Sequence, residues 1–319
     1  MGTKNFGNRT DGKPSPLQAV PGLKEYWGKD IFLTEALTLE ALKALDKAKK
    51  LGQPFYLYLS HYAVHIPVDR DKRFYSKYLE AGLSEKEAGY AALLEGMDKS
   101  LGDILDWLEK NEEDKNTIII FMSDNGGFST DTAWRDPPLH TQNAPLNSGK
   151  GSAYEGGIRV PMIVKWTGMV KPGTTCGSYL IIEDFFPTIL EMAGIRKFKT
   201  VQPIDGKSFV PLLKGTGDPS KGRNLYWNYP NLWGNEGPGI GSTCTIRSGD
   251  WKLIYYYQTG EKELFNIRND IGEKQNLAAQ CPAIVKKLSK DLGQYLRKVK
   301  AQRPAFKSNG KSCPWPDEV

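Results

Sequence analysis

Apolar and polar positions alternate with two different periods along the first two thirds of the chain. Residues 33–52 (LTEALTLEALKALDKAKKLG) repeat at a helical period and end in a glycine, which predicts a helix. Residues 54–60 (PFYLYLS) are short and aromatic-rich, which predicts a buried strand. Ser84 and Glu87 have the spacing of a capping box at the start of a long helix. The apolar stripe of that helix has spacings of three and four and comprises Tyr90, Leu94, Met97, Leu101, Leu105 and Leu108.

Two further strands follow this helix. Residues 118–122 (IIIFM) and 160–166 (VPMIVKW) are apolar runs of strand length, and a short helix over 187–193 is closed by Gly194. Strands and helices therefore alternate, and the strands carry apolar residues on both faces. This pattern is typical of an α/β protein with a mostly parallel central sheet covered by helices.

The pattern changes after about residue 205. The runs STCTIRS, WKLIYYYQ and ELFNI have strand character and are separated by polar turns, and one helix follows over roughly 283–300. Consecutive strands followed by a helix predict a small antiparallel α+β subdomain. We therefore expect an α/β domain over residues 1–204 and a small C-terminal subdomain over residues 205–319.

Composition excludes some classes of protein. The 319 residues are 39% hydrophobic and 25% charged, as in ordinary globular proteins, and no apolar run approaches the ~18 residues that span a bilayer. The net charge of +6 equals the excess of nine basic over three acidic residues in 281–319, so it indicates a solvated tail helix more than a polyanion-binding surface. No nucleic-acid-binding motif is present. The four cysteines are far apart and form no CxxC, so zinc is not expected and disulfides stay open.

The strand at 118–122 ends in polar residues that can bind a cation. Asp124 and Asn125 follow it directly, and two glycines come next. In open α/β sheets, ligands bind at the carboxyl ends of strands, and carboxylate and amide oxygens suit Ca²⁺ or Mg²⁺. The alternative is that Asp-Asn-Gly-Gly is only a turn, since these are favoured turn residues.

A histidine and a lysine are two more candidates. His65 follows the predicted strand at 54–60 and precedes Ile66-Pro67, which restricts the local backbone. Imidazole suits proton transfer near neutral pH. Lys150 lies in a glycine-flanked loop and offers a positive charge for an anionic oxygen. The alternatives are a structural histidine, which we favour for His61, and an ordinary surface lysine.

Taken in order, the motifs AVHIP, SDNGG, NAPL…GKGSAYEGGIRVP, DFFPTILEMAG, DGKSFVPLLKG and GDWKLI…ELFNI resemble those of the sulfatase family of the alkaline-phosphatase superfamily. The resemblance covers residues 30–300, and GKGSAYEGGIRVP is its most specific block. The SDNGG form also favours sulfatases over related phosphodiesterases and phosphonate hydrolases.

The resemblance implies roles for the four candidates. Sulfatases of this family use a divalent cation, usually Ca²⁺, and a formylglycine nucleophile made from Cys or Ser. By match, Asp124 and Asn125 resemble two metal ligands, Lys150 the lysine that contacts the sulfate, and His65 the histidine that helps protonate the leaving group. The implied substrates are sulfated carbohydrates or aryl sulfates, and a periplasmic or secreted location is expected from the family. Oligomeric state stays open.

The chain departs from the family pattern in one respect. Residues 1–319 contain no Cys/Ser-x-Pro/Ala-x-Arg motif for formylglycine and no upstream aspartate pair. We therefore expect the C-terminal two-thirds of a sulfatase, inactive and poorly soluble when alone. The alternatives are a catalytically dead glycan- or protein-binding domain, and a phosphodiesterase or phosphonate hydrolase. The aromatic-rich segment 224–239 is compatible with sugar stacking or with core packing, and we favour packing.

Overall fold

The computed structural model describes residues 20–195 and 197–319, which form two compact units. The N-terminal unit comprises Met1–Thr117, described from residue 20 onward, and Asp131–Leu139; the C-terminal unit comprises Ile118–Thr130 and His140–Val319. This division by compactness does not test the predicted boundary at residues 204/205, which stays a prediction.

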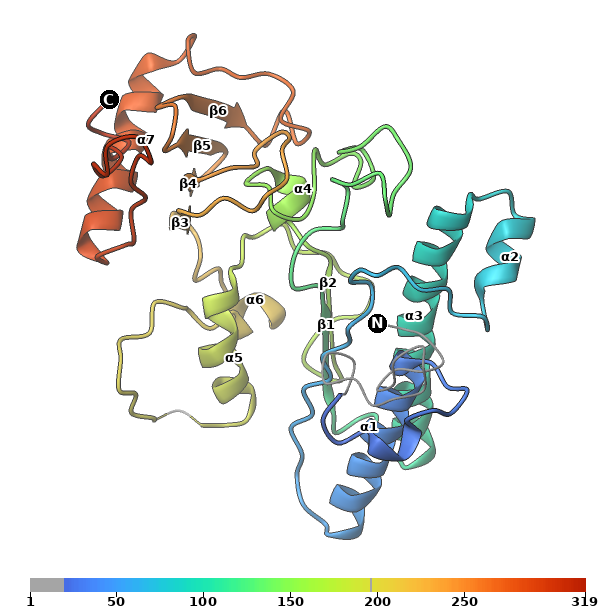
Figure 1. Cartoon of the computed structure of the whole chain (residues 1–319). Coiled ribbons are helices and arrows are strands. Elements are labelled where there is room, and N and C mark those ends of the chain that lie inside the picture. Colours follow the sequence, from blue (N-terminus) through green and yellow to red (C-terminus); the bar gives the residue numbers. More distant parts are fainter. Residues whose placement is uncertain (1–19, 196) are drawn as a thin grey trace. The chain divides into compact units, whose positions relative to one another are not determined.

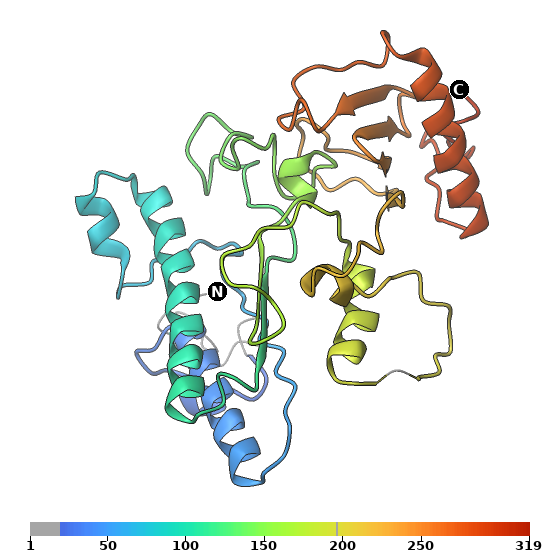
Figure 2. The same cartoon turned by 180° about the vertical axis from the view of Figure 1, so that it is seen from behind.

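The N-terminal unit is helical in its described part. Its elements are η1 (Lys24–Tyr26), α1 (Leu33–Lys50), α2 (Tyr75–Glu80) and α3 (Glu85–Lys110). Helix α3 begins where the capping box predicts, because the Ser84 hydroxyl accepts a hydrogen bond of 3.3 Å from the Glu87 amide. Helices α1 and α3 lie side by side (Figure 1, Figure 2), and Thr38 Oγ1 donates to Ser100 Oγ between them over 2.6 Å.

The buried face of α3 differs from the predicted stripe. Leu94 is 45% exposed, whereas five of the seven buried positions are small residues, namely Ala88, Gly89, Ala92, Gly96 and Ser100. The other two are Leu93 and Leu108. Small residues on this face let neighbouring groups approach closely, as the Asp71 carboxylate does at Gly96. Apolar spacing alone therefore misplaced the packed face.

The prediction of a buried strand at residues 54–60 is wrong. The segment belongs to no strand, and the side chains of Tyr56 and Tyr58 are 70% and 78% exposed. A strand needs a hydrogen-bonded partner, and no described residue pairs with this segment. Its aromatic side chains are therefore displayed and not packed.

Strands β1 (Ile118–Met122) and β2 (Met162–Trp166) form a two-stranded antiparallel ladder in the C-terminal unit. The predicted parallel pairing is thus not found here, and every ladder among the described residues is antiparallel. Met122 is opposite Met162, so the chain leaves β1 and enters β2 at the same end of the ladder. A run of apolar residues does not distinguish a strand with parallel neighbours from one with antiparallel neighbours. The loop 123–161 between them carries three of the four candidate residues.

The remaining elements of the C-terminal unit include an antiparallel sheet followed by a helix, as predicted after residue 205. They are α4 (Glu155–Ile158), η2 (Ile182–Asp184), α5 (Phe185–Met192), α6 (Val210–Leu213), β3 (Asn224–Tyr229), β4 (Thr243–Ser248), β5 (Trp251–Tyr256), β6 (Lys262–Asn266) and α7 (Pro282–Lys298). The four strands form one antiparallel sheet in the order β3-β4-β5-β6, and α7 packs on it (Figure 1). The largest buried cluster joins sheet and helix, for example Leu253 with Leu292.

Two further observations bear on the sequence-based expectations. None of the helices in the described ranges is long and apolar enough to cross a membrane. All four cysteines, at positions 176, 244, 281 and 313, are free thiols.

Candidate functional site

The turn that follows β1 is held against the loop that precedes β2. The amide of Gly126 donates a 2.9 Å hydrogen bond to the Gly157 carbonyl. The two segments are so close that a Cβ atom on Gly126 would lie 1.7 Å from the carbonyl oxygen of Gly156. The glycines after Asp124 and Asn125 are therefore required by this backbone contact, and not only by a turn.

Three more hydrogen bonds join the Lys150 loop to the same turn. The Lys150 amide donates to the Gly127 carbonyl over 3.1 Å. The side-chain amide of Asn143 donates to the carbonyls of Gly127 and Ser148, over 3.0 and 2.9 Å. Sequence reasoning assigned Asn143 no role, although it opens the quoted motif NAPL. The structure thus brings Asp124, Asn125 and Lys150 onto one hydrogen-bonded backbone assembly.

The side chains of these three residues are open to a ligand. Asp124 is exposed, and Asn125 and Lys150 are partly exposed. The Asn125 amide nitrogen donates to the Gly126 carbonyl over 2.9 Å, which leaves its side-chain oxygen available. Among the described residues, neither the Asp124 carboxylate nor the Lys150 ammonium has a hydrogen-bond or ion-pair partner. The Asp124 carboxylate, the Asn125 side-chain oxygen and the Lys150 ammonium group are therefore accessible and not engaged with other described residues.

The donor set at this turn suits a hard cation but is incomplete. Asp124 and Asn125 offer two oxygen-bearing side chains, whereas Ca²⁺ takes about six to eight oxygen ligands. No group of three or more His, Cys, Asp or Glu side chains in the described residues has the arrangement of a metal site. The residues present fit the chemistry of Ca²⁺ or Mg²⁺, and further oxygen ligands are needed to complete the coordination.

His65 belongs to the N-terminal unit. It is exposed, and its Nδ1 lies 2.8 Å from the carbonyl oxygen of Ile66. In a neutral ring this contact places the proton on Nδ1 and leaves Nε2 as the acceptor. His61 is structural, as expected, because its Nε2 lies 3.0 Å from Ser100 Oγ and burial lowers its pKa.

His140 is a residue of this region that sequence reasoning left without a role. Its amide donates to the Ser129 carbonyl, and its carbonyl accepts from the Ser148 amide, both over 2.9 Å. The imidazole lies against Gly237, where an added Cβ would be 2.2 Å from ring atom Cε1. Burial lowers the pKa of His140, which favours the neutral ring. No motif around His140 signalled this position.

Glu155 anchors the Lys150 loop to the four-stranded sheet. Its amide donates to Glu273 Oε2 over 2.6 Å, and its own carboxylate oxygen Oε1 accepts from Lys252 Nζ of β5 over 3.1 Å. Arg247 of β4 lies 3.6 Å from the same oxygen. All of these side chains are buried. The loop that carries Lys150 is thus tied to the C-terminal subdomain by charge.

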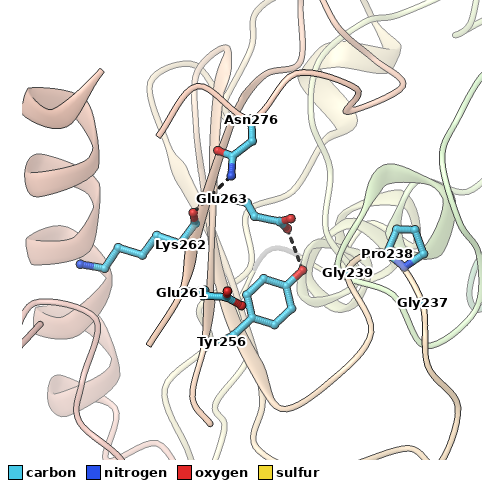
Figure 3. Close-up of a pocket in the computed structure, with 8 residues that line it drawn as sticks. All are labelled: Gly237, Pro238, Gly239, Tyr256, Glu261, Lys262, Glu263 and Asn276. Atoms are coloured by element: carbon cyan, nitrogen blue, oxygen red, sulfur yellow. Dashed lines mark hydrogen bonds between the residues drawn. The ribbon is translucent and has the colours of Figure 1, made fainter. Parts of the chain in front are cut away.

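An open pocket of about 500 Å³ lies near this anchor (Figure 3). It is lined by residues 237–239, Tyr256, residues 261–263 and Asn276. The Glu263 carboxylate accepts hydrogen bonds from the hydroxyls of Tyr256, over 2.7 Å, and Tyr154, over 2.9 Å. The ammonium of Lys262 donates to the carbonyl of Val319 over 2.6 Å. The charged groups that line the pocket are therefore engaged, and the pocket is polar without being an anion site.

Comparisons with known proteins agree with this description. The Sulfatase family matches residues 5–195, and the family described as N-sulphoglucosamine sulphohydrolase, C-terminal, matches residues 149–302. A sulfatase of Formosa agariphila is 32% identical, over 91% of this chain and 54% of that protein. An uncharacterized sulfatase of Escherichia coli is 33% identical, over 81% of this chain and 49% of that protein.

Solved structures agree as well. The crystal structure of Ps i-CgsB in complex with k-i-k-neocarrahexaose is similar with a TM-score of 0.72 and 28% identity, over 89% of this chain and 56% of that one. The alkaline-phosphatase-like α/β fold expected from the sequence is consistent with these neighbours. The chain spans about half the length of the curated relatives it matches. By the match over residues 5–195, the chain belongs to the sulfatase family.

Proposed function

We propose that this chain supplies metal-binding and sulfate-binding residues to a sulfatase that hydrolyses sulfate esters. The observation that carries the proposal is the docking of residues 124–127 on the loop that holds Lys150. It presents a carboxylate, a carboxamide and an ammonium group at one end of the β1–β2 ladder. The oxygens of the carboxylate and the carboxamide can bind a cation, and the ammonium group can bind the anionic sulfate ester.

Each candidate residue has a distinct role in this proposal. Asp124 and Asn125 hold Ca²⁺ or Mg²⁺ through their oxygens, together with ligands from elsewhere. When bound, the cation neutralises negative charge on the sulfate oxygens. Lys150 binds a sulfate oxygen. His65, when its imidazole is protonated on both nitrogens, donates the Nε2 proton to the oxygen of the departing alcohol and becomes the neutral ring.

The nucleophile of the proposed reaction lies outside these groups. A formylglycine is the nucleophile expected of the family, and residues 1–319 contain no motif from which it is made. We therefore expect binding, but no turnover, from these 319 residues alone. The specific alternative is a domain that binds a sulfated glycan or a protein without catalysis, and the missing motif is what favours it. A phosphodiesterase or phosphonate hydrolase is a weaker alternative, distinguished by turnover of phosphate and not of sulfate esters.

The relatives support a sulfated substrate. One is an N-acetylgalactosamine-6-O-sulfatase of Bacteroides thetaiotaomicron, 28% identical over 85% of this chain and 52% of that protein. Another is the human steryl-sulfatase, 32% identical over 64% of this chain and 33% of that protein. We propose a sulfated carbohydrate or another sulfate ester as the substrate class.

The proposal is tested by calorimetric titration of residues 1–319 with CaCl₂ and then with sodium sulfate. Asp124→Asn is expected to weaken Ca²⁺ binding at least tenfold, since each charged ligand contributes strongly to affinity. Lys150→Ala is expected to weaken sulfate binding by a similar factor. The matched controls are Asp205→Asn and Lys165→Ala, which change exposed side chains of the same types. Equal affinities in Asp124→Asn and wild type would rule out the proposed metal ligand.

A further inference from the structure

The glycine-rich segment from Trp233 to Gly239, here called the strap, lies directly against the Lys150 loop. The six-membered ring of the Trp233 indole contacts Gly151, where an added Cβ would be 2.1 Å from indole atom Cε3. Gly151 is the residue after Lys150, so the indole packs on the backbone directly after the proposed sulfate-binding lysine. Trp233 is partly exposed. Part of the Trp233 side chain is therefore left accessible to a ligand.

The strap is held in place at several points of the same loop. Ser152 Oγ donates to the Pro238 carbonyl over 2.7 Å, and the Ala153 amide donates to the Gly239 carbonyl over 2.9 Å. The side-chain amide of Asn235 donates to Thr130 Oγ1 over 2.8 Å. These contacts join the strap to Thr130, which follows the turn after β1, and to the loop that carries Lys150. Trp233 is therefore a preorganised surface and not a side chain on a free loop.

We propose that the strap is a sugar-binding wall of the candidate site, so that the ligand of the site is a sulfated sugar and not a flat aryl sulfate. This inference rests on the proposed function. The apolar faces of a pyranose ring pack on an indole, and its hydroxyls need polar neighbours. The strap supplies both, because it carries the Trp233 indole and the side-chain amide of Asn235, and its Gly237 lies against the imidazole of His140.

The far end of the strap leads into the pocket of Figure 3. Residues 237–239 line that pocket opposite Tyr256 and Glu263, and Pro238 and Gly239 also bond to Ser152 and Ala153 of the Lys150 loop. Its volume of about 500 Å³ accepts a second sugar unit. The wall thus continues from Lys150 into a polar space, as recognition of a saccharide longer than one unit requires.

The experiment measures binding to residues 1–319 by calorimetry in buffer with Ca²⁺. The probes are N-acetylglucosamine 6-sulfate, 4-nitrophenyl sulfate and inorganic sulfate. Trp233→Ala is expected to weaken binding of the sugar sulfate about tenfold and to leave binding of inorganic sulfate unchanged. Trp233→Phe is expected to retain most of the affinity for the sugar sulfate. The matched control is Trp166→Ala, which removes an indole at the other end of the β1–β2 ladder. Melting temperatures of all variants verify that each is folded.

Three results overturn the sugar-binding wall. One is a wild-type chain that binds no sugar sulfate, or binds the aryl sulfate equally well. The second is a folded Trp233→Ala variant whose affinity for the sugar sulfate is unchanged. The third is a folded Trp233→Ala variant whose affinities for the sugar sulfate and for inorganic sulfate fall by the same factor. Lys150→Ala separates this inference from the proposed function. If Lys150→Ala leaves sulfate binding intact while Trp233→Ala still weakens binding of the sugar sulfate, the role proposed for Lys150 is wrong and the sugar-binding wall is supported.

Discussion

Lys252 Nζ lies 2.7 Å from Glu273 Oε1, and neither side chain is exposed to solvent. A second carboxylate, that of Glu155, lies 3.1 Å from the same ammonium group. One buried lysine thus faces two carboxylates. Burial raises the pKa of Glu273 to about 7, even though Lys252 acts to lower it, and the nearby Glu155 charge raises it further. This cluster couples the loop of the candidate site to strand β5.

We predict that Glu273 makes the stability of the chain fall between about pH 4.5 and pH 7. In the unfolded chain its carboxyl loses its proton near 4.5, whereas in the folded protein it keeps the proton up to about 7. A raised carboxyl pKa contributes stability that is present below the unfolded value and lost as pH rises through the folded value. Relative to Glu273→Gln, the free energy of unfolding of the wild type is expected to fall by about 3 kcal/mol across this pH range. Urea unfolding of both proteins from pH 4 to 8 measures this difference, and parallel curves would contradict it.

Gly126 is predicted to tolerate no side chain. The added Cβ of Gly126→Ala would collide with the backbone carbonyl of Gly156, which cannot rotate away as a side chain does. We expect a loss of about 3 kcal/mol and the loss of Ca²⁺ binding, because the turn that carries Asp124 can no longer dock. The control is Gly102→Ala in α3, where no atom lies within 4 Å of the new Cβ. That variant is expected to be more stable by about 0.5–1 kcal/mol in urea unfolding. A Gly126→Ala protein as stable as wild type would exclude the close contact.

A buried ion pair in the C-terminal unit predicts sensitivity to acid. Asp184 is fully buried, and its carboxylate accepts hydrogen bonds of 2.7 and 2.6 Å from Arg223. Burial acts to raise the pKa of Asp184, but Arg223 and the backbone amides of Lys207 and Ile181 lower it overall. Asp184→Asn is expected to cost about 3–5 kcal/mol at pH 7, because it leaves the Arg223 charge unpaired.

The pH dependence of this cost gives the measurement. A lowered carboxyl pKa contributes stability that is present above the unfolded value, here 3.8, and is lost as pH falls through the folded value. The stability gap between wild type and Asp184→Asn should therefore narrow below about pH 3.8. Acid titrations followed by circular dichroism measure this gap. Asp205→Asn, an exposed site, is the control, and a gap independent of pH would argue against the ion pair.

The exposed aromatic side chains of residues 54–60 predict self-association. Tyr56 and Tyr58 are 70% and 78% exposed in a segment that pairs with no strand among the described residues. Such a segment is a template for pairing with another chain. Tyr56→Ser/Tyr58→Ser is expected to reduce aggregation of residues 1–319 in light-scattering measurements. Val201→Ser, at a fully exposed position, is the control and should change nothing.

The sequence by itself determined the local structure and the candidate chemistry of this protein. The capping pair at Ser84 and the apolar periods of the C-terminal strands depend on neighbouring residues, so they can be read along the chain. The family motifs also located Asp124, Asn125 and Lys150 before any fold was known. The backbone contact between the glycines of SDNGG and those of GKGSAYEGG was not expected from the sequence.

Only the tertiary structure decided how distant segments meet. The antiparallel pairing of β1 with β2, the exposure of residues 54–60 and the contact of Trp233 with Gly151 all depend on partners that sequence spacing does not encode. The same holds for Lys252, which reads as an ordinary strand lysine until Glu155 and Glu273 are placed around it. Pairing direction and buried charge depend on which groups the folded chain brings together, and those groups are far apart in the sequence.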